Sequence, residues 1–543
     1  MAIIRSQCGQ CSVGCGIRAI TGDDRNLIIE GDTVHPANGG LLCERGLMLK
    51  DGVGLDGRLL HPMVAGRRVG WDRAVAHIAR RLGAAMARHG PGTIALHISG
   101  TLLTEDYYVA NKLMKGFFGS AHIQAPWSGG ASMAALQRAA FGEDVMPAAA
   151  EDIDRAQVLL VLGEGALRDH PILLERIEAA RDEQGLKLIL LTQDEESEVE
   201  ADIRLPVQEG SMDRLLTGAL LHFHEAGLAR LPDMVRDAMV QGHDLWSVAR
   251  SSGLSATAIR GFYDLLAAAD HLVTLFDEGA GWRTAAAAIN LHVATGRIGR
   301  PGATPFALSA SANGMSGREV GCASDHLAAH RPFTADALKD VARFWGAPNM
   351  ASRAGLDGDA LRDAMRAGAV KALWCIGSGE GAEDWLREAR DSGIFTIASR
   401  DRAGAMDDAD VLLPSPIWIE RDGTATGSDR LISRQRWLLP LPDEVKPDWW
   451  AMTRVAQAMG WGDAFHYERP ADIYREHVRL TAYRNDGDRL LDLRRHAPIS
   501  NPAYDELTPW RWGDVPFDGG NFPTPDGRAR LIWPLDQPLP AIS

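Results

Sequence analysis

Short apolar runs alternate with amphipathic stretches through most of the chain. Runs of Leu, Val, Ile and Ala predict buried strands at 93–100, 158–163, 186–192, 271–276, 372–377, 395–399 and 410–414. Helical spacing of apolar residues predicts helices at 71–90, 107–119, 172–185 and 283–295, the first two ending at Gly90 and Gly119. Wholly apolar strands that alternate with helices are typical of parallel sheets in doubly wound α/β domains.

Three regions depart from this alternation. The first 57 residues are short and Gly-rich, and the segments 17–23 and 26–32 predict two strands joined by a polar turn. The Gly- and Pro-rich stretch from Gly299 to Gly317 predicts an ordered loop or a domain boundary. The tail from about residue 499 is rich in Pro, Trp and Gly and has little periodicity.

Composition and charge narrow the function classes. The 543 residues carry a net charge of −15, which argues against a nucleic-acid partner and against docking on anionic lipid. No run of about 18 or more apolar residues occurs, so no membrane span is expected. The first cysteine pair follows the N-terminus too closely for a signal peptide, which predicts a cytoplasmic protein. Six cysteines are too few for a disulfide scaffold in a chain of this length.

Four of the cysteines form one spaced group. Their pattern is Cys8-x2-Cys11-x3-Cys15, followed after 27 residues by Cys43. Four thiolates are the usual ligand set of a [4Fe–4S] cluster, and the flanking glycines ease the tight backbone path. A zinc site and four buried thiols are the two alternatives. The remaining cysteines, Cys322 and Cys375, lie in α/β segments and are expected to be small core residues.

This spacing, followed by HPANGGLLCERG, resembles the molybdopterin oxidoreductase family. The likeness is strongest to assimilatory nitrate reductases, with formate dehydrogenases and periplasmic nitrate reductases as more distant relatives. Five further segments resemble family segments in family order: TEDYYVANKLMKGFFGS (104–120), INLHVATGRIGRPGA (289–303), NGMSGREVG (313–321), ISRQR (432–436) and FPTPDGRAR (522–530).

The resemblance implies a layout of domains. It implies a small, β-rich iron–sulfur domain at 1–57, onto which the segment from about 430 to 543 returns. It implies one Rossmann-like, doubly wound domain formed by 58–145 and 331–429, and a second formed by 146–330. A fourth domain, which helps to enclose a bis-pterin molybdenum cofactor in the family, is expected to be absent here. Arg45, two residues after Cys43, corresponds to the basic residue on the family's electron path; a surface cation is the alternative.

The segment that should hold the molybdenum ligand departs from the family pattern. In this type of nitrate reductase a cysteine ligates molybdenum, and the equivalent position here is Gly129, which has no side chain. Ser128 is adjacent, and other family branches use a serine ligand. A serine before two glycines is nevertheless more typical of an ordinary loop.

The turns that should bind the pterin also depart from the family pattern. Gly163-Glu164-Gly165 stands where the family has a Gly-Ser-Asn type turn, and a carboxylate there would face ligand phosphates. Thr192-Gln193 and the acidic run 194–200 replace an Asp-Pro-Arg type segment. Gly377-Ser378-Gly379-Glu380 lacks the Asn and Pro of the family. We interpret these as fold-preserving turns without a ligand, and a molybdopterin cofactor is therefore doubtful.

Histidines are the remaining candidate site residues. His326 and His330 are four apart on a predicted helix, which would suit a metal, but no Glu follows His326 as a zinc hydrolase requires. His170 lies in an Asp-His-Pro sequence. For these three residues we expect capping or packing roles.

Three hypotheses follow. The first is a molybdenum-free electron relay, a subunit paired with a catalytic or flavin protein. The second is an active molybdopterin-dependent nitrate reductase with an unusual ligand, whose missing domain a partner supplies. The third is a non-redox scaffold that the cluster stabilises. Molybdenum content separates the first two, and reversible reduction of the cluster separates the first from the third.

Overall fold

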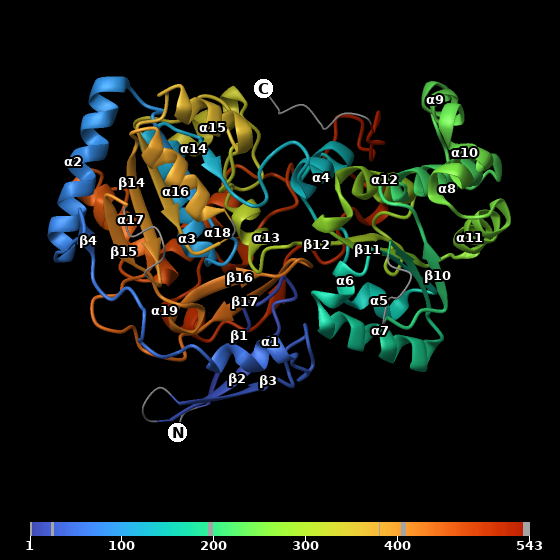
Figure 1. The fold of residues 1–543 in the computed structure, drawn as a ribbon, viewed down its shortest axis with the longest axis horizontal. Coiled ribbons are helices and arrows are strands. Elements are labelled where there is room, and N and C mark those ends of the chain that lie inside the picture. Colours follow the sequence, from blue (N-terminus) through green and yellow to red (C-terminus); the bar gives the residue numbers. More distant parts are fainter. Residues whose placement is uncertain (1–2, 23–25, 194–198, 380, 403–408, 536–543) are drawn as a thin grey trace.

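Four β-sheets organise the part of the chain that the structure, a computed structural model, describes: residues 3–22, 26–193, 199–379, 381–402 and 409–535. A five-stranded and a seven-stranded sheet lie side by side, and two small three-stranded sheets lie between and below them in Figure 1. This arrangement confirms the α/β class with a small β-rich region at the N-terminus. The domain boundaries drawn from the sequence stay predictions.

The N-terminal sheet holds the first cysteines at its turn. Its strands are antiparallel, in the order β1(Ile3–Gln7), β2(Gly16–Thr21) and β3(Leu27–Gly31). The last two were predicted. The first, β1, was not, because its Ile-Ile-Arg-Ser-Gln sequence runs directly into the cysteine motif.

The five-stranded sheet is parallel throughout. Its order is β10(Ile203–Pro206), β9(Lys187–Thr192), β8(Val158–Leu162), β11(Leu272–Asp277) and β12(Pro305–Leu308). The chain enters at the central strand β8, moves outward to β10, and then returns to the other side with β11. The switch point between β8 and β11 is where doubly wound sheets bind ligands.

Strand β12 corrects the expectation of a loop from Gly299 to Gly317. Four apolar residues, Pro305 to Leu308, pair in parallel with β11 at the edge of the sheet. An edge strand can begin with proline because one of its sides needs no ladder hydrogen bond. The Gly- and Pro-rich flanks concealed so short a strand in the sequence.

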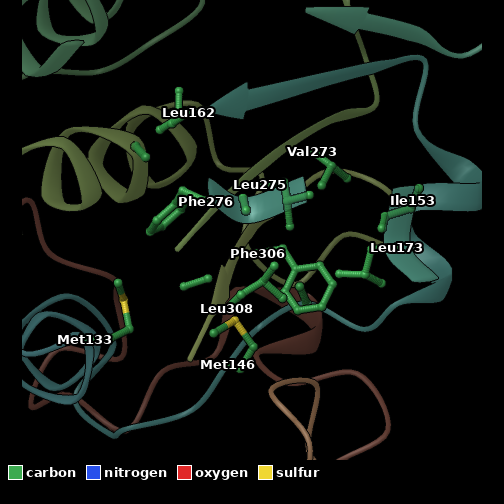
Figure 2. Close-up of a cluster of buried hydrophobic side chains, with 14 of the residues drawn as sticks. Met133, Met146, Ile153, Leu162, Leu173, Val273, Leu275, Phe276, Phe306 and Leu308 are labelled. Atoms are coloured by element: carbon green, nitrogen blue, oxygen red, sulfur yellow. The ribbon is translucent and has the colours of Figure 1, made fainter. Parts of the chain in front are cut away.

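The core beside this sheet is apolar and closely packed. Figure 2 shows Leu308 of β12 beside Met146, with Phe306, Phe276 of β11 and Met133 in the same region. All five side chains are buried. This core fixes the strand ends that carry the cavity described below.

The seven-stranded sheet combines two distant parts of the chain. Its order is β5(Arg67–Arg68), β4(Met63–Val64), β15(Val411–Pro414), β14(Phe395–Arg400), β13(Ala372–Ile376), β6(Ile94–Ile98) and β7(Ile123–Gln124). The five strands from β15 to β7 are parallel, and β4 and β5 add antiparallel pairs at one edge.

A fourth, antiparallel sheet lies between the N-terminal sheet and the two large ones (Figure 1). Its strands are β16(Gly423–Thr426), β17(Leu431–Gln435) and β18(Trp510–Arg511). Trp418 Nε1 donates to the Gln7 carbonyl at 2.9 Å, and Ser6 Oγ donates to the Arg436 carbonyl at 2.8 Å. The C-terminal part of the chain is thereby tied to strand β1.

Helices pack against the two large sheets and against one another, and α1 lies beside the N-terminal sheet (Figure 1). They are α1(Glu44–Leu47), α2(Trp71–His89), α3(Thr104–Asn111), the π-helical η2(Lys112–Phe118), α4(Met133–Phe141), α5(Glu151–Arg155), α6(Gly165–Arg168), α7(Pro171–Gln184), α8(Met212–Glu225), α9(Asp233–His243), α10(Leu245–Ser252), α11(Ala256–Ala268), α12(Trp282–Ala294), α13(Gly314–Glu319), α14(Ala335–Trp345), α15(Gly358–Arg366), α16(Ala382–Asp391), α17(Asp448–Ala458), α18(Pro470–Ala482) and α19(Asn501–Asp505). Gly90 and Gly119 end their helices at φ values of +85° and +66°, as predicted. Among the described residues no helix is long and apolar enough to cross a membrane.

Candidate functional site: the cysteine loop and the adjoining cavities

The four spaced cysteines converge beside the N-terminal sheet. Cys8 and Cys15 flank the β1–β2 turn, where the Cys8 amide donates to the Cys15 carbonyl at 2.8 Å. Cys11 lies within the turn, and Cys43 precedes helix α1. The charges of Cys11 and Cys43 both raise the pKa of Cys8 and of Cys15, so all four sulfurs lie within electrostatic reach of one another. Four convergent thiols are the donor set that a [4Fe–4S] cluster requires.

Burial dominates the protonation of these thiols. It raises the pKa of Cys8 to about 12 and also raises the pKa values of Cys11 and Cys15. Backbone amides of Gln10 and Val13 donate to the sulfurs of Cys8 and Cys11 and oppose this shift. The thiols of Cys8, Cys11 and Cys15 are therefore protonated without a metal, and iron binding would release their protons.

The choice between a zinc ion and a [4Fe–4S] cluster stays a prediction. Within residues 3–22, 26–193, 199–379, 381–402 and 409–535, no three His, Cys, Asp or Glu side chains are placed to hold one metal ion.

Arg45 joins the cysteine loop to the five-stranded domain. Its guanidinium donates to the Asp169 carbonyl, just after helix α6. Its charge also lowers the pKa values of Cys8 and Cys11. Arg45 is thus a half-buried cation beside the thiols, as the resemblance implies, and its place on an electron path stays a prediction.

A cavity of about 430 Å³ lies at the carboxyl ends of strands β8, β9 and β11, at the switch point of the sheet. We call it the switch-point cavity. Among the described residues, three carboxylates line it, from Glu164, Asp169 and Asp277, against one cation, Arg168. Thr192 Oγ1 donates to Glu164 Oε1 at 2.8 Å and holds that carboxylate at the carboxyl end of β9.

A second cavity, of about 480 Å³, adjoins the first through Asp277. Ser128 and Gly129 line it, on the loop before helix α4. The backbone of Gly129 has φ +98°, which a residue with a Cβ adopts only with strain. The Ser128 hydroxyl donates to the Ile123 carbonyl over 3.4 Å.

The glycine turns named from the sequence lie in different places. Gly163, Glu164 and Gly165 line the switch-point cavity. The turn of Gly377 and Ser378 instead packs within the seven-stranded domain, where a Cβ on Gly377 would meet Ser99 Oγ at 2.1 Å. Glu380 and residues 194–198 of the acidic run lie outside the described residues.

The prediction of a helix carrying His326 and His330 is wrong. Gly321, Ala329 and His330 have φ values of +74°, +59° and +56°, which a helix cannot contain. His326 bonds Asp325 and the Arg318 carbonyl, whereas His330 bonds Glu143 at 2.9 Å. These histidines pack among buried polar groups, in keeping with the role expected of them.

Two residues of the site escaped the sequence analysis. Asp277 follows the predicted strand 271–276 directly, so the rule that ligands meet the carboxyl ends of parallel strands would have identified it. Ser12, which contacts His170, gave no signal, because 158 residues separate the pair.

Comparisons with known proteins agree with this architecture. Residues 58–458 match the model of the molybdopterin oxidoreductase family, and residues 1–53 match the molybdopterin oxidoreductase Fe4S4 domain. A nitrate reductase of Klebsiella oxytoca is 37% identical over the whole chain, and one of Shewanella frigidimarina is 32% identical. The chain spans 65% and 62% of the lengths of these relatives.

A solved structure extends the likeness to the fold. Acetylene hydratase from Pelobacter acetylenicus superposes with a TM-score of 0.75 at 18% identity, covering 98% of this chain and 77% of that one. The fold is therefore shared even where the sequences have diverged. From the extent of the family match, and from the cysteine loop at its N-terminal end, it follows that this chain belongs to the molybdopterin oxidoreductase family and carries that family's Fe4S4 domain.

Proposed function

We propose that this chain is an iron–sulfur electron-transfer subunit that descends from a nitrate reductase-like molybdoenzyme and has lost the molybdenum site. One [4Fe–4S] cluster would be held by Cys8, Cys11, Cys15 and Cys43. The observation that carries the proposal is a contrast between neighbouring sites. The thiols are complete and convergent, whereas Gly129 stands at the position of the family's molybdenum-ligating cysteine, and the lining of the switch-point cavity lacks the positive charge that a phosphate-bearing cofactor needs.

The charge of the switch-point cavity supports this reading. A pterin dinucleotide carries a pyrophosphate, which proteins bind with cations and free backbone amides. Here Glu164, Asp169 and Asp277 face the space, and Arg168 is the one cation among the described residues that line it. Three carboxylates against one guanidinium would repel a pyrophosphate, so the lining does not fit that group.

The loop at Gly129 supports the same conclusion. Glycine offers no ligand atom, and its φ of +98° disfavours any replacement that does. The neighbouring Ser128 hydroxyl points toward a protein carbonyl, with which it shares a long hydrogen bond. The loop at Gly129 therefore does not fit a molybdenum ligand.

The proposed activity is one-electron transfer. When bound, the cluster supplies a site that accepts and returns a single electron. The amides of Gln10 and Val13 and the charge of Arg45 would favour the more negative, reduced state. Arg45, which donates to the Asp169 carbonyl, would lie on the path that electrons take from the cluster. A relay needs a donor and an acceptor, so we propose a catalytic or flavin protein as partner, in the cytoplasm.

An active nitrate reductase is the competing proposal, and the 37% identity to a nitrate reductase favours it. In that case Ser128 would be the metal ligand, after a shift of its loop. The two proposals agree on the cluster and differ only at the cavities.

Iron, molybdenum and tungsten analysis of anaerobically purified protein tests the choice. We expect about four irons per chain, no molybdenum or tungsten, and a reversible EPR signal on reduction. Cys43→Ala should lower the iron content, whereas Cys375→Ala, a buried cysteine of the seven-stranded sheet, should leave it unchanged. About one molybdenum per chain would refute the relay, and a cluster that no reductant reduces would favour the scaffold.

A further inference from the structure

Residues 168–170 form a narrow wall between the cysteine loop and the switch-point cavity. Arg168 and Asp169 line the cavity. On the other side, the Asp169 carbonyl accepts from Arg45, and His170 Nε2 lies 3.2 Å from Ser12 Oγ. Ser12 stands directly after Cys11, so the wall contacts the loop that holds the thiols.

The hydrogen-bond directions at His170 are fixed by its other neighbour. Nδ1 lies 3.0 Å from the Ala166 carbonyl, which can only accept. Nδ1 therefore carries the proton of the neutral ring, and Nε2 is an acceptor. Burial lowers the pKa of His170 and keeps the ring neutral. It follows that the Ser12 hydroxyl donates to His170.

Ser12 is immobilised from two sides. Its side chain is 2% exposed and that of His170 is 3% exposed, so water does not compete for the hydroxyl. Its carbonyl accepts from the Ser428 amide at 2.9 Å, in the turn between β16 and β17. Between Cys8 and Cys15 it is the one residue with a hydroxyl group.

We propose that His170 is a positioning residue that sets the reduction potential of the cluster by holding the Ser12 hydroxyl away from the cluster sulfurs. Hydrogen bonds to cluster sulfurs stabilise the reduced state, which carries one more negative charge, and so raise the potential. With His170 as acceptor, the hydroxyl is withheld and the potential stays low. Without that acceptor, the buried hydroxyl would donate instead to a sulfur of the loop that carries it. One electron enters the cluster in this step and no proton is transferred.

This inference rests on the cluster of the proposed function but is independent of the loss of molybdenum. The experiment is a potentiometric titration of the full chain with dithionite and mediators, followed by EPR, after iron analysis. His170→Ala should shift the reduction equilibrium about tenfold toward the reduced state, a rise of ~59 mV for one electron. His170→Gln, whose amide oxygen can replace Nε2 as acceptor, should restore the wild-type potential.

Ser12 provides the second arm. Ser12→Ala should leave the potential unchanged, because the hydroxyl does not reach the sulfurs in the native loop. In Ser12→Ala/His170→Ala the shift should vanish. His292→Ala is the matched control, since His292 makes a similar buried bond to the hydroxyl of Thr274, at 2.8 Å, inside the five-stranded domain.

A shift that persists in the double variant would show that His170 acts on the cluster without Ser12, and would overturn the proposal. So would an unchanged potential in His170→Ala, or a shifted one in Ser12→Ala. If wild-type protein binds no iron, both this inference and the proposed function fail. If the cluster is intact and its reduction potential is the same in His170→Ala as in wild type, only this inference fails.

Discussion

A buried glutamate should make the stability of this fold depend on pH in an unusual direction. Glu105, near the start of α3, is fully buried and joins three segments distant in sequence. Its carboxylate accepts from the Thr424 amide at 2.8 Å, from Thr424 Oγ1 at 2.9 Å and from the Tyr504 hydroxyl at 2.7 Å. Burial outweighs these donors and raises its pKa to about 7.

The sign follows from proton binding in the two states. Below a pH of about 4.5 both states are protonated and Glu105 contributes nothing. Between there and pH 7 the unfolded state ionises while the folded state keeps its proton, so the free energy of unfolding falls as pH rises. Above pH 7 the full cost is present, about 3 kcal/mol.

The test compares wild-type protein with Glu105→Gln. The glutamine can keep all three bonds, because its oxygen can accept from the Thr424 amide while its NH₂ group faces two hydroxyls that can reverse to accept. Urea unfolding is measured at pH 5 and pH 8 under anaerobic conditions. The stability of the variant relative to wild type should rise by about 2.5 kcal/mol across this range, because part of the cost is already present at pH 5. Subtracting the free energy of unfolding of wild type from that of the variant removes the contribution of every group that titrates alike in both proteins.

The exposed Glu183→Gln is the control and should show no such trend. A difference that stays constant from pH 5 to pH 8 would mean that the folded protein does not raise the pKa of Glu105. That result would refute the reasoning.

Three further predictions concern the site and its supports. Cys43→Ala should lose most of its iron and its EPR signal, because the cluster would keep only three of its four thiolates. Gly129→Cys should bind no molybdenum and should be destabilised by about 1–2 kcal/mol, since φ is +98° there, as metal analysis and urea unfolding would show. Glu420→Gln should cost about 3–5 kcal/mol by leaving the buried Arg58 guanidinium unpaired. The pair Arg58→Met/Glu420→Leu should recover most of that loss in the same assay; these side chains are fully buried and bond at 2.8 and 3.2 Å.

The elements that the sequence predicted correctly share a physical cause. A strand buried on both faces must be apolar throughout, so the runs at 186–192 and 372–377 identified β9 and β13 within a residue. The ends of helices that stop at a glycine with positive φ were predicted equally well. The cysteine group was readable because three of its four members lie on one short loop.

The failures also have physical causes. Strand β12 is four residues long and edge-placed, so neither length nor periodicity separated it from its Gly- and Pro-rich flanks. The spacing of His326 and His330 matched one helical face, but tertiary packing holds this segment in left-handed turns. Contacts between residues far apart in the chain, such as Ser12 with His170, are set by how the domains meet, and no local pattern encodes them.

The same contacts give a physical account of how one site could be kept while its neighbour is lost. The wall at 168–170 is held by the Ala166 carbonyl, the Ser12 hydroxyl and the Arg45 guanidinium, all of them protein atoms. None of these bonds needs a ligand in the switch-point cavity. Substitutions on the cavity side, such as a carboxylate at Glu164 held by Thr192, therefore leave the supports of the cysteine loop in place. The cysteine loop and the switch-point cavity therefore share residues 168–170, whose hydrogen bonds do not depend on a ligand in the cavity.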